Sequence, residues 1–196
     1  KASESKRLCC GPLASYALYA LLDERPYVAD PANASRTQLW DPRKRDWSQS
    51  LAAMFEVPLD IMPACVPTRH GYGHLRFANR EIPVVVCTGD QSAAPFAFGP
   101  FDEEALYLNI GTGAFLQRVS SADDMRLLRS VTYSDQDNFI SVQEGTVNGA
   151  ASALDWLNER IGIDTHRAAL ALMPEQNFEP PLFINAIGGV GSRYWR

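Results

Sequence analysis

The chain has 196 residues, of which 46% are hydrophobic and 21% charged, and its formal net charge is -5 at pH 7. This composition is ordinary for a globular protein of one sizeable domain or two small ones, and the acidic balance argues against a nucleic-acid partner. No apolar run approaches the roughly 20 residues that cross a bilayer, and residues 8–22 do not form a signal peptide, so we expect a cytoplasmic protein with no membrane partner.

Two helices are expected in the first third of the chain. Residues 8–22 are apolar on all sides, which is typical of a buried helix. The second helix begins with Asp46 or Ser48 as its N-cap and ends before Pro58. Residues 61–80 contain several prolines and glycines, which predicts extended chain and loop.

An apolar strand over Ile82–Thr88 breaks at Gly89 and places an acid, Asp90, on the turn that follows. The strand does not alternate polar and apolar residues, which predicts that it is covered on both faces. In open α/β sheets, ligands bind beyond the C-terminal ends of the strands. A helix can begin at Ser92. The carboxylate can therefore accept a proton from an attacking hydroxyl, or it can simply cap the helix. The residues alone leave both readings open.

A turn-rich acidic stretch, residues 99–104, is the best candidate for a domain boundary. Two β-rich runs then flank Gly111-Thr112-Gly113, which predicts a hairpin with a glycine-rich tip. Unobstructed backbone N–H groups and the Thr112 hydroxyl can hold phosphate oxygens, although a plain tight turn explains the same residues. A carboxylate at a strand end, followed by such a hairpin, describes a cleft between two lobes.

The rest of the chain mixes strands and helices. A strand pair is expected over about 127–133 and 138–143, followed by a helix that Asn148 caps and Gly162 closes. Another helix is expected over Thr165–Leu172. This order indicates an α/β fold, and the absence of a G-x-G-x-x-G segment between a strand and a helix argues against a simple Rossmann sheet.

The cysteines do not suggest a metal or redox site. Cys9, Cys10, Cys65 and Cys87 form no C-x-x-C pair, and no histidine stands at metal-ligand spacing from them. We expect reduced and mostly buried thiols and no protein-bound metal.

Five segments resemble, in order and spacing, the central part of the FGGY-family carbohydrate kinases. They are VADPANASRTQLWDPRKRDWSQSLAAMFEVPLDIMP, VVVCTGDQSAA, LNIGTGAFL, EGTVNGAASALDWL and FINAIGGVGSRYW, and they cover most of the chain from about Leu8 to Trp195. The resemblance implies an α/β, actin-like (ribonuclease H-like) fold of two lobes, incomplete in this chain. Residues 1–99 would form the second half of the N-terminal, sugar-binding lobe, and residues 100–196 the first half of the C-terminal, nucleotide-binding lobe.

The resemblance also implies an activity, the ATP-dependent phosphorylation of a hydroxyl on a sugar or polyol, with ATP and Mg²⁺ as cofactors. Asp90 matches the catalytic base that takes the proton from the attacking hydroxyl. Gln91 matches a ligand of a substrate hydroxyl, and Gly111, Thr112 and Gly113 match the loop that contacts the nucleotide phosphates. The expected partner is a small sugar or polyol, and a homodimer is possible.

The sequence also departs from the family pattern. Ala151 and Asp155 stand where the family often has a glycine and a glutamine near the nucleotide, which makes their nucleotide role weak. The chain is shorter than the family kinases and has no Asp-x-Gly-Thr turn for Mg-ATP, so we expect it to be inactive alone. The alternatives are a non-catalytic sugar- or nucleotide-binding regulator with a decayed actin-like fold, and an actin-like phosphatase or ATPase.

Overall fold

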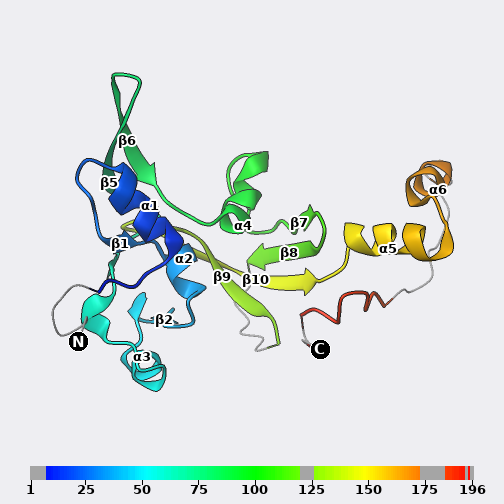
Figure 1. Cartoon of the computed structure of the whole chain (residues 1–196), viewed down its shortest axis with the longest axis horizontal. Coiled ribbons are helices and arrows are strands. Elements are labelled where there is room, and N and C mark those ends of the chain that lie inside the picture. Colours follow the sequence, from blue (N-terminus) through cyan, green and yellow to red (C-terminus); the bar gives the residue numbers. More distant parts are fainter. Residues whose placement is uncertain (1–7, 120–125, 173–183, 193, 195–196) are drawn as a thin grey trace. The chain divides into compact units, whose positions relative to one another are not determined.

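The structure is a computed structural model that divides into two compact units (Figure 1). It describes residues 8–119, 126–172, 184–192 and 194. Unit 1 comprises Lys1–Phe101 and Ser130–Ser141, and unit 2 comprises Asp102–Arg129 and Val142–Arg196. The assignment of residues 1–99 and 100–196 to a sugar-binding and a nucleotide-binding lobe stays a prediction.

Unit 1 is built from short helices, very short strands and one long hairpin (Figure 1). Its helical segments are α1 (Leu13–Leu21), α2 (Pro31–Ser35), α3 (Gln49–Met54), η1 (Leu59–Ile61), α4 (Asp90–Ala93) and η2 (Ala94–Phe98). Its short strands pair as β1 (Val28–Ala29) with β4 (Ala64–Cys65), in parallel, and β2 (Trp40–Asp41) with β3 (Asp46–Trp47), antiparallel. The hairpin consists of the antiparallel strands β5 (Arg69–Phe77) and β6 (Arg80–Val86).

Side-chain caps explain where two of the short helices begin. The Asp30 carboxylate accepts the N–H of Asn33 at 3.1 Å, and Pro31 occupies the first turn of α2, where its missing N–H costs nothing. Ser48 caps α3 in the same way by accepting the N–H of Leu51 at 3.3 Å. The prediction of Ser48 as a helix cap is therefore confirmed.

The β5–β6 hairpin was not expected, because residues 61–80 were predicted as extended chain and loop. Ala78 and Asn79 form its turn, with φ of 48° and 63°. Positive φ at both central residues is the mark of the type I′ turn, whose twist suits two antiparallel strands. The register pairs Phe77 with Arg80 across this turn.

Burial in α1 and β6 differs from the prediction. Within α1 only Ser15 and Leu18 are buried, and Leu13 is 81% exposed. Val85 and Val86 of β6 are each 51% exposed, and among the described residues β6 pairs only with the antiparallel β5. The predictions of a buried helix and of a strand covered on both faces are therefore wrong for the residues that the structure describes.

Small apolar clusters hold unit 1 together. One consists of Ala29, Ala34, Trp40 and Val131, with Trp47, Cys65 and Phe139 packed against it. Another consists of Leu18, Leu22 and Tyr72, with Val28, Val66, Leu75, Val84 and Cys87 packed against it. The first cluster draws on residues that follow the β7–β8 region in sequence, which explains why 130–141 belong to this unit.

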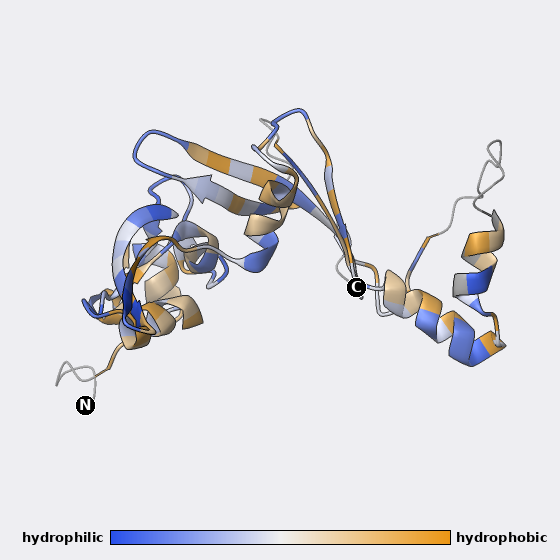
Figure 2. Cartoon of the chain, turned by 90° about the horizontal axis from the view of Figure 1, so that it is seen from above, coloured by the Kyte–Doolittle hydropathy of each residue, from blue (hydrophilic) through white to orange (hydrophobic). Residues whose placement is uncertain are grey.

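Unit 2 contains the predicted glycine-tipped hairpin and both predicted helices. Its strands and helices are β7 (Tyr107–Ile110), β8 (Ala114–Val119), α5 (Ala151–Ile161) and α6 (Thr165–Leu172). The strands β9 (Leu128–Ser134) and β10 (Phe139–Val147) each run through both units, and the sheet order is β7-β8-β10-β9. Along α5 both hydrophobic and hydrophilic residues occur, and α6 changes from hydrophilic at its start to hydrophobic at its end (Figure 2).

The structure also bears on several smaller predictions. Gly162 ends α5 with φ of 66°, as predicted for a left-handed C-cap. All the cysteines are free thiols, but Cys9 and Cys10 are exposed rather than buried. None of the helices in the described part of the chain has the length and hydrophobicity of a membrane span.

Candidate functional site

Asp90 is the first residue of α4, and three residues separate it from Val86, the last residue of β6. Gly89 occupies the N-cap position, and no side chain caps this helix. The Asp90 carboxylate instead accepts the N–H of its neighbour Gln91 at 2.7 Å, and the residue is exposed. The reading of Asp90 as a helix cap is therefore wrong. What remains is a carboxylate whose direction is fixed locally and whose other lone pairs are accessible.

The strand end before Asp90 is tied to a buried acid. The Cys87 thiol donates to Asp30 Oδ1 at 3.4 Å, and the Cys87 N–H donates to the carbonyl of Thr68 at 3.1 Å. Burial, followed by the charge of Asp30, raises the pKa of Cys87 to about 12, so the thiol keeps its proton and remains a donor. Asp30 has no exposed surface. Sequence reasoning missed this link, because its two ends lie 57 residues apart.

The segment after Asp90 is anchored by aromatic packing within unit 1. Gln91 is half-buried, and the helix continues into η2, where Pro95 is buried. The ring of Phe96 packs on those of Phe101 and Tyr133, with centroid distances of 5.6 and 6.1 Å. The catalytic candidate therefore lies between a hydrogen-bonded strand end and an aromatic anchor.

In unit 2, Gly111, Thr112 and Gly113 form the tip of the β7–β8 hairpin, as predicted. The Gly111 N–H donates to the Gly113 carbonyl at 2.7 Å, so this N–H closes the turn. A Cβ at Gly113 would lie 3.0 Å from the carbonyl oxygen of Val147, a tight contact that favours glycine here. The Thr112 side chain is exposed.

The hairpin tip caps the start of α5. The N–H groups of Ala150 and Ser152 donate to the Thr112 carbonyl at 2.8 and 3.3 Å, and the N–H of Ala151 donates to the Gly111 carbonyl at 3.1 Å. The Ser152 hydroxyl adds a bond of 3.0 Å to the Thr112 carbonyl. Carbonyls from the hairpin thus satisfy the donors that a helix normally leaves open at its first turn.

The predicted cap of α5 is wrong, and the two candidate residues on this helix, Ala151 and Asp155, lie in different surroundings. Asn148 does not cap α5; its amide instead donates to the Gly188 carbonyl at 3.4 Å. Ala151 lies against the hairpin tip, and its nucleotide role stays a prediction. Asp155 is exposed farther along the helix, and no hydrogen bond or ion pair of its carboxylate is found among the described residues.

Residues 184–192 lie along the end of β10. The Ser192 N–H donates to the Thr146 carbonyl at 3.0 Å, and the Ser192 hydroxyl accepts the Thr146 N–H at 2.7 Å. A Cβ at Gly191 would overlap the Thr146 carbonyl, and one at Gly149 would overlap that of Ile187. Both glycines are therefore needed for the close approach of these backbones.

A buried polar pair crosses the sheet beside this region. Glu144 of β10 lies opposite Gln117 of β8, and the Gln117 amide donates to the Glu144 carboxylate at 3.0 Å. Each residue is only 2% exposed. The pair supports the sheet from inside and is not open to a ligand.

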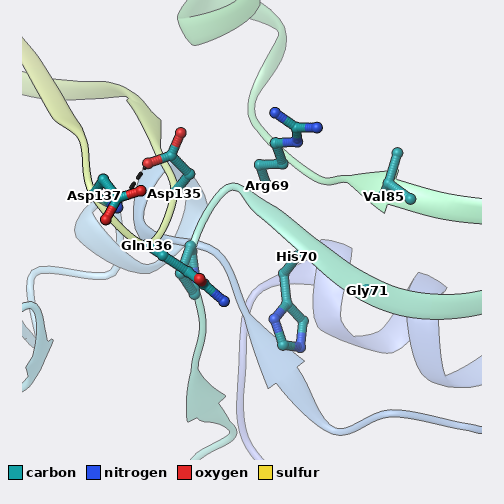
Figure 3. A pocket seen from close by; sticks show the side chains of 8 residues that line it. Arg69, His70, Gly71, Val85, Asp135, Gln136 and Asp137 are labelled. Carbon is teal, nitrogen blue, oxygen red and sulfur yellow. Dashed lines mark hydrogen bonds between the residues drawn. The ribbon is translucent and has the colours of Figure 1, made fainter.

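The predicted residues are therefore distributed over both units. Asp90 and Gln91 lie in unit 1, whereas Gly111, Thr112, Gly113, Ala151 and Asp155 lie in unit 2. In the part of the chain that is described, no three His, Cys, Asp or Glu side chains gather as a metal site. A cavity of about 560 Å³ in unit 1 is lined by none of the predicted residues (Figure 3).

Comparisons with known proteins can be set against this geometry. Residues 5–97 match the FGGY family of carbohydrate kinases, N-terminal domain. The glycerol kinase of Enterococcus casseliflavus is 28% identical over 202 residues, an alignment that covers 98% of this chain and 40% of the relative. The chain thus spans about 40% of the length of the curated relatives it matches.

Solved structures give the same result for the fold. A crystal structure of Plasmodium falciparum glycerol kinase with ADP matches with a TM-score of 0.74 and 24% identity, over 84% of this chain and 35% of that one. A xylulose kinase from Brucella ovis matches with a TM-score of 0.71 and 21% identity, over 92% and 39%. The predicted fold is confirmed: the chain has part of the actin-like α/β fold of these structures.

Proposed function

We propose that this chain, which matches the N-terminal domain of the FGGY family of carbohydrate kinases over residues 5–97 and glycerol kinases over nearly its whole length, forms the central part of an enzyme that transfers a phosphoryl group from ATP to a hydroxyl of a sugar or polyol. The single observation that carries this proposal is the Gly89-Asp90-Gln91 turn. It holds an exposed carboxylate in a fixed direction at the end of a strand. Phosphoryl transfer depends mainly on such positioning, because the protein has little covalent chemistry to perform.

Asp90 is the proposed general base. Its bond to the Gln91 N–H orients the carboxylate, and its exposure lets a substrate hydroxyl approach within hydrogen-bond distance. The carboxylate would orient this hydroxyl and accept its proton as the oxygen attacks. The Gln91 side chain can both donate and accept hydrogen bonds, which suits a second hydroxyl of the same substrate.

The tip of the β7–β8 hairpin is the proposed phosphate contact. ATP, when bound, supplies the phosphoryl group, and Mg²⁺ neutralises phosphate charge. The residues fit phosphate oxygens, because the Thr112 hydroxyl is exposed and a Cβ at Gly111 would meet nothing closer than 4.0 Å. Gly113 keeps the tip against β10, and Ala151 lies beside it, while Asp155 is the weakest member of the set. Mg²⁺ usually needs only one or two carboxylates beside the phosphates, so no larger cluster of ligands is required.

Asp90→Asn in the intact protein tests the proposal. The amide keeps the size and hydrogen-bonding reach of the carboxylate but cannot take a proton. We expect kcat for ADP release in the presence of a polyol panel to fall at least about 100-fold while KM and the unfolding midpoint stay unchanged. Asp60→Asn, at an exposed acid in η1, is the matched control and should keep full turnover. Full turnover in Asp90→Asn would dismiss the assigned base.

A non-catalytic sugar- or nucleotide-binding regulator is the second candidate. It is favoured by the Gly111 N–H, which closes the turn instead of facing a ligand, and by the exposed carboxylate of Asp155, for which the described part of the chain offers no partner. Calorimetry with Mg-ATP and polyols separates the two functions. Binding without ADP release indicates the regulator, and ADP release that depends on a polyol indicates the kinase.

A further inference from the structure

A polar cavity of about 560 Å³ lies between the start of β5 and the turn that joins β9 to β10, and all of its lining residues belong to unit 1 (Figure 3). β5 contributes Arg69 and His70 to its lining, and the turn contributes Gln136 and Asp137. Val85 of β6 adds an apolar surface. The cavity is therefore lined by side chains of several chemical types from separate strands.

The turn on one side of the cavity is held rigidly by its own carboxylate. Asp135 Oδ1 accepts the N–H groups of Asn138 and Asp137 at 2.7 and 2.9 Å, and Asp135 Oδ2 accepts the Tyr133 hydroxyl at 2.9 Å. These bonds, with that of Asn138 largest, lower the pKa of Asp135 to about 2. Asp135 thus shapes the turn through these bonds, and it lines the cavity together with Gln136 and Asp137.

Within residues 8–119, 126–172, 184–192 and 194, most of the groups that face the cavity have no partner. Among the described residues, no hydrogen bond or ion pair is found for the guanidinium of Arg69, the carboxylate of Asp137 or the amide of Gln136. The His70 ring contacts only the edge of Tyr72, with a centroid distance of 5.3 Å. The lining therefore offers donors from arginine, acceptors from aspartate, and groups that serve as both.

We propose that this cavity binds a small neutral molecule with several hydroxyl groups, a sugar or polyol, at a site whose lining does not include Asp90. A hydroxyl can either donate or accept a hydrogen bond, so a molecule with several hydroxyls can donate to Asp137 and accept from Arg69 without carrying charge. The lining carries two carboxylates, Asp135 and Asp137, against the one guanidinium of Arg69, which disfavours an anion, and the volume is in the range of small-molecule pockets. The choice of a hydroxylated ligand over a zwitterion such as an amino acid rests on the proposed function.

Gly71 offers a way to block the cavity without touching its charges. It lines the cavity, and a Cβ built on it meets no atom within 4 Å. A leucine at this position would project into open space, so Gly71→Leu should fold normally and occupy part of the volume. Loss of binding in this variant would not depend on any change of charge.

The experiment is a titration of the intact protein with xylitol, followed by the amide chemical shifts of Gly71 and Gln136. We expect saturable shifts, and a dissociation constant at least about tenfold higher in Arg69→Ala and Asp137→Ala, because each removes a charged hydrogen-bonding group. Gly71→Leu should abolish the shifts. Arg43→Ala removes an equally exposed cation from the β2–β3 turn, and Asp90→Asn changes the proposed base; both should bind as the parent does.

The other outcomes would overturn either the hydroxylated-ligand site or the assignment of Asp90 as the base. No shift of these amides with xylitol, equal binding by Gly71→Leu, or shifts with alanine in place of xylitol would overturn the hydroxylated-ligand site. Loss of xylitol binding at these amides in Asp90→Asn would show one shared site and also overturn it. Full ADP release by Asp90→Asn, with xylitol binding intact, would overturn the proposed base and leave this site standing.

Discussion

The carbonyl oxygen of Thr112 accepts the N–H of Ala150 at 2.8 Å, which joins the tip of the β7–β8 hairpin to the first turn of α5. A helix is thereby capped by the backbone of a distant turn instead of by a side chain of its own. If the tip shifted, backbone N–H groups at the start of α5 would lose their acceptors, and each unpaired N–H group costs free energy. The proposed phosphate contact is therefore as rigid as the helix behind it.

Gly113→Ala should destabilise unit 2, because the added Cβ would lie 3.0 Å from the carbonyl of Val147 and 3.3 Å from that of Asn148. Both contacts are with backbone, so the hairpin must move and the cap of α5 weakens. We expect a loss of about 1–3 kcal/mol in the free energy of unfolding, measured by urea denaturation. Gly111→Ala, which meets nothing closer than 4.0 Å, is the control and should change it by less than about 0.5 kcal/mol.

Gly162→Ala should cost about 1 kcal/mol for a different reason. The residue has φ of 66° in the left-handed region, and a Cβ there meets no atom within 4 Å. The cost therefore comes from the backbone conformation alone. Gly162→Asn should recover part of it, since asparagine tolerates this region better than alanine. Equal stability of the alanine variant and the parent would contradict the assigned C-cap.

Alkylation should distinguish the cysteines. Burial raises the pKa of Cys65 and of Cys87 to about 12, with Asp46 and Asp30 respectively adding to the effect. Since the thiolate is the reactive form, iodoacetamide at pH 8 should modify Cys9 and Cys10, which are exposed, well before the other two. Mass spectrometry of partially modified protein gives the order. Early labelling of Cys87 would contradict its bond to Asp30.

The pair of His74 and Glu24 should make part of unit 1 sensitive to pH. His74 Nδ1 lies 2.6 Å from Glu24 Oε1, and the His74 N–H donates to Glu24 Oε2 at 2.7 Å. The His74 side chain, followed by its N–H, lowers the pKa of Glu24 from 4.5 to about 2, and the bond to Glu24 raises the pKa of His74 above 6.5. Glu24 therefore contributes stability that is lost as the pH falls from 4.5 towards 2. His74 contributes stability below 6.5 that is lost as the pH rises through its raised pKa.

The test is an NMR titration of the His74 ring. In Glu24→Gln the midpoint should fall towards 6.5. The remaining neighbours are Glu81, whose Oε1 lies 3.8 Å from Nδ1, and Asp23, which pairs with Arg76, and they should keep it from falling further. Glu81→Gln is the matched control and should produce a smaller shift. An unchanged midpoint in Glu24→Gln would refute the assignment.

Local signals in the sequence predicted the elements that depend on local chemistry. The glycine-tipped hairpin, the left-handed end of α5 at Gly162, the cap of α3 at Ser48 and the helix Thr165–Leu172 all appear as expected. In each case a residue's own backbone or hydroxyl preference decides the structure, so a short window of sequence is sufficient.

The failures come from partners that are remote in sequence. Asn148 is a good cap residue, yet carbonyls from the β7–β8 tip already occupy the donors of α5. The apolar run of β6 suggested cover on both faces, whereas the structure pairs it with β5 through a turn at Ala78 and Asn79 that had not been recognised. The link from Cys87 to Asp30 likewise spans 57 residues. A short segment of sequence does not show which distant residue will contact it in the folded chain.

The division of β9 and β10 between the units has a consequence for synthesis. Val131 and Phe139 pack in the cluster around Trp40, so the first 101 residues do not contain all the side chains that fill their own interior. A nascent chain must be made as far as Phe139 before this cluster can close, by which time the glycine-tipped hairpin has already been made. Translation order and assembly order therefore differ, and a gene split at residue 101 should yield an N-terminal product that aggregates.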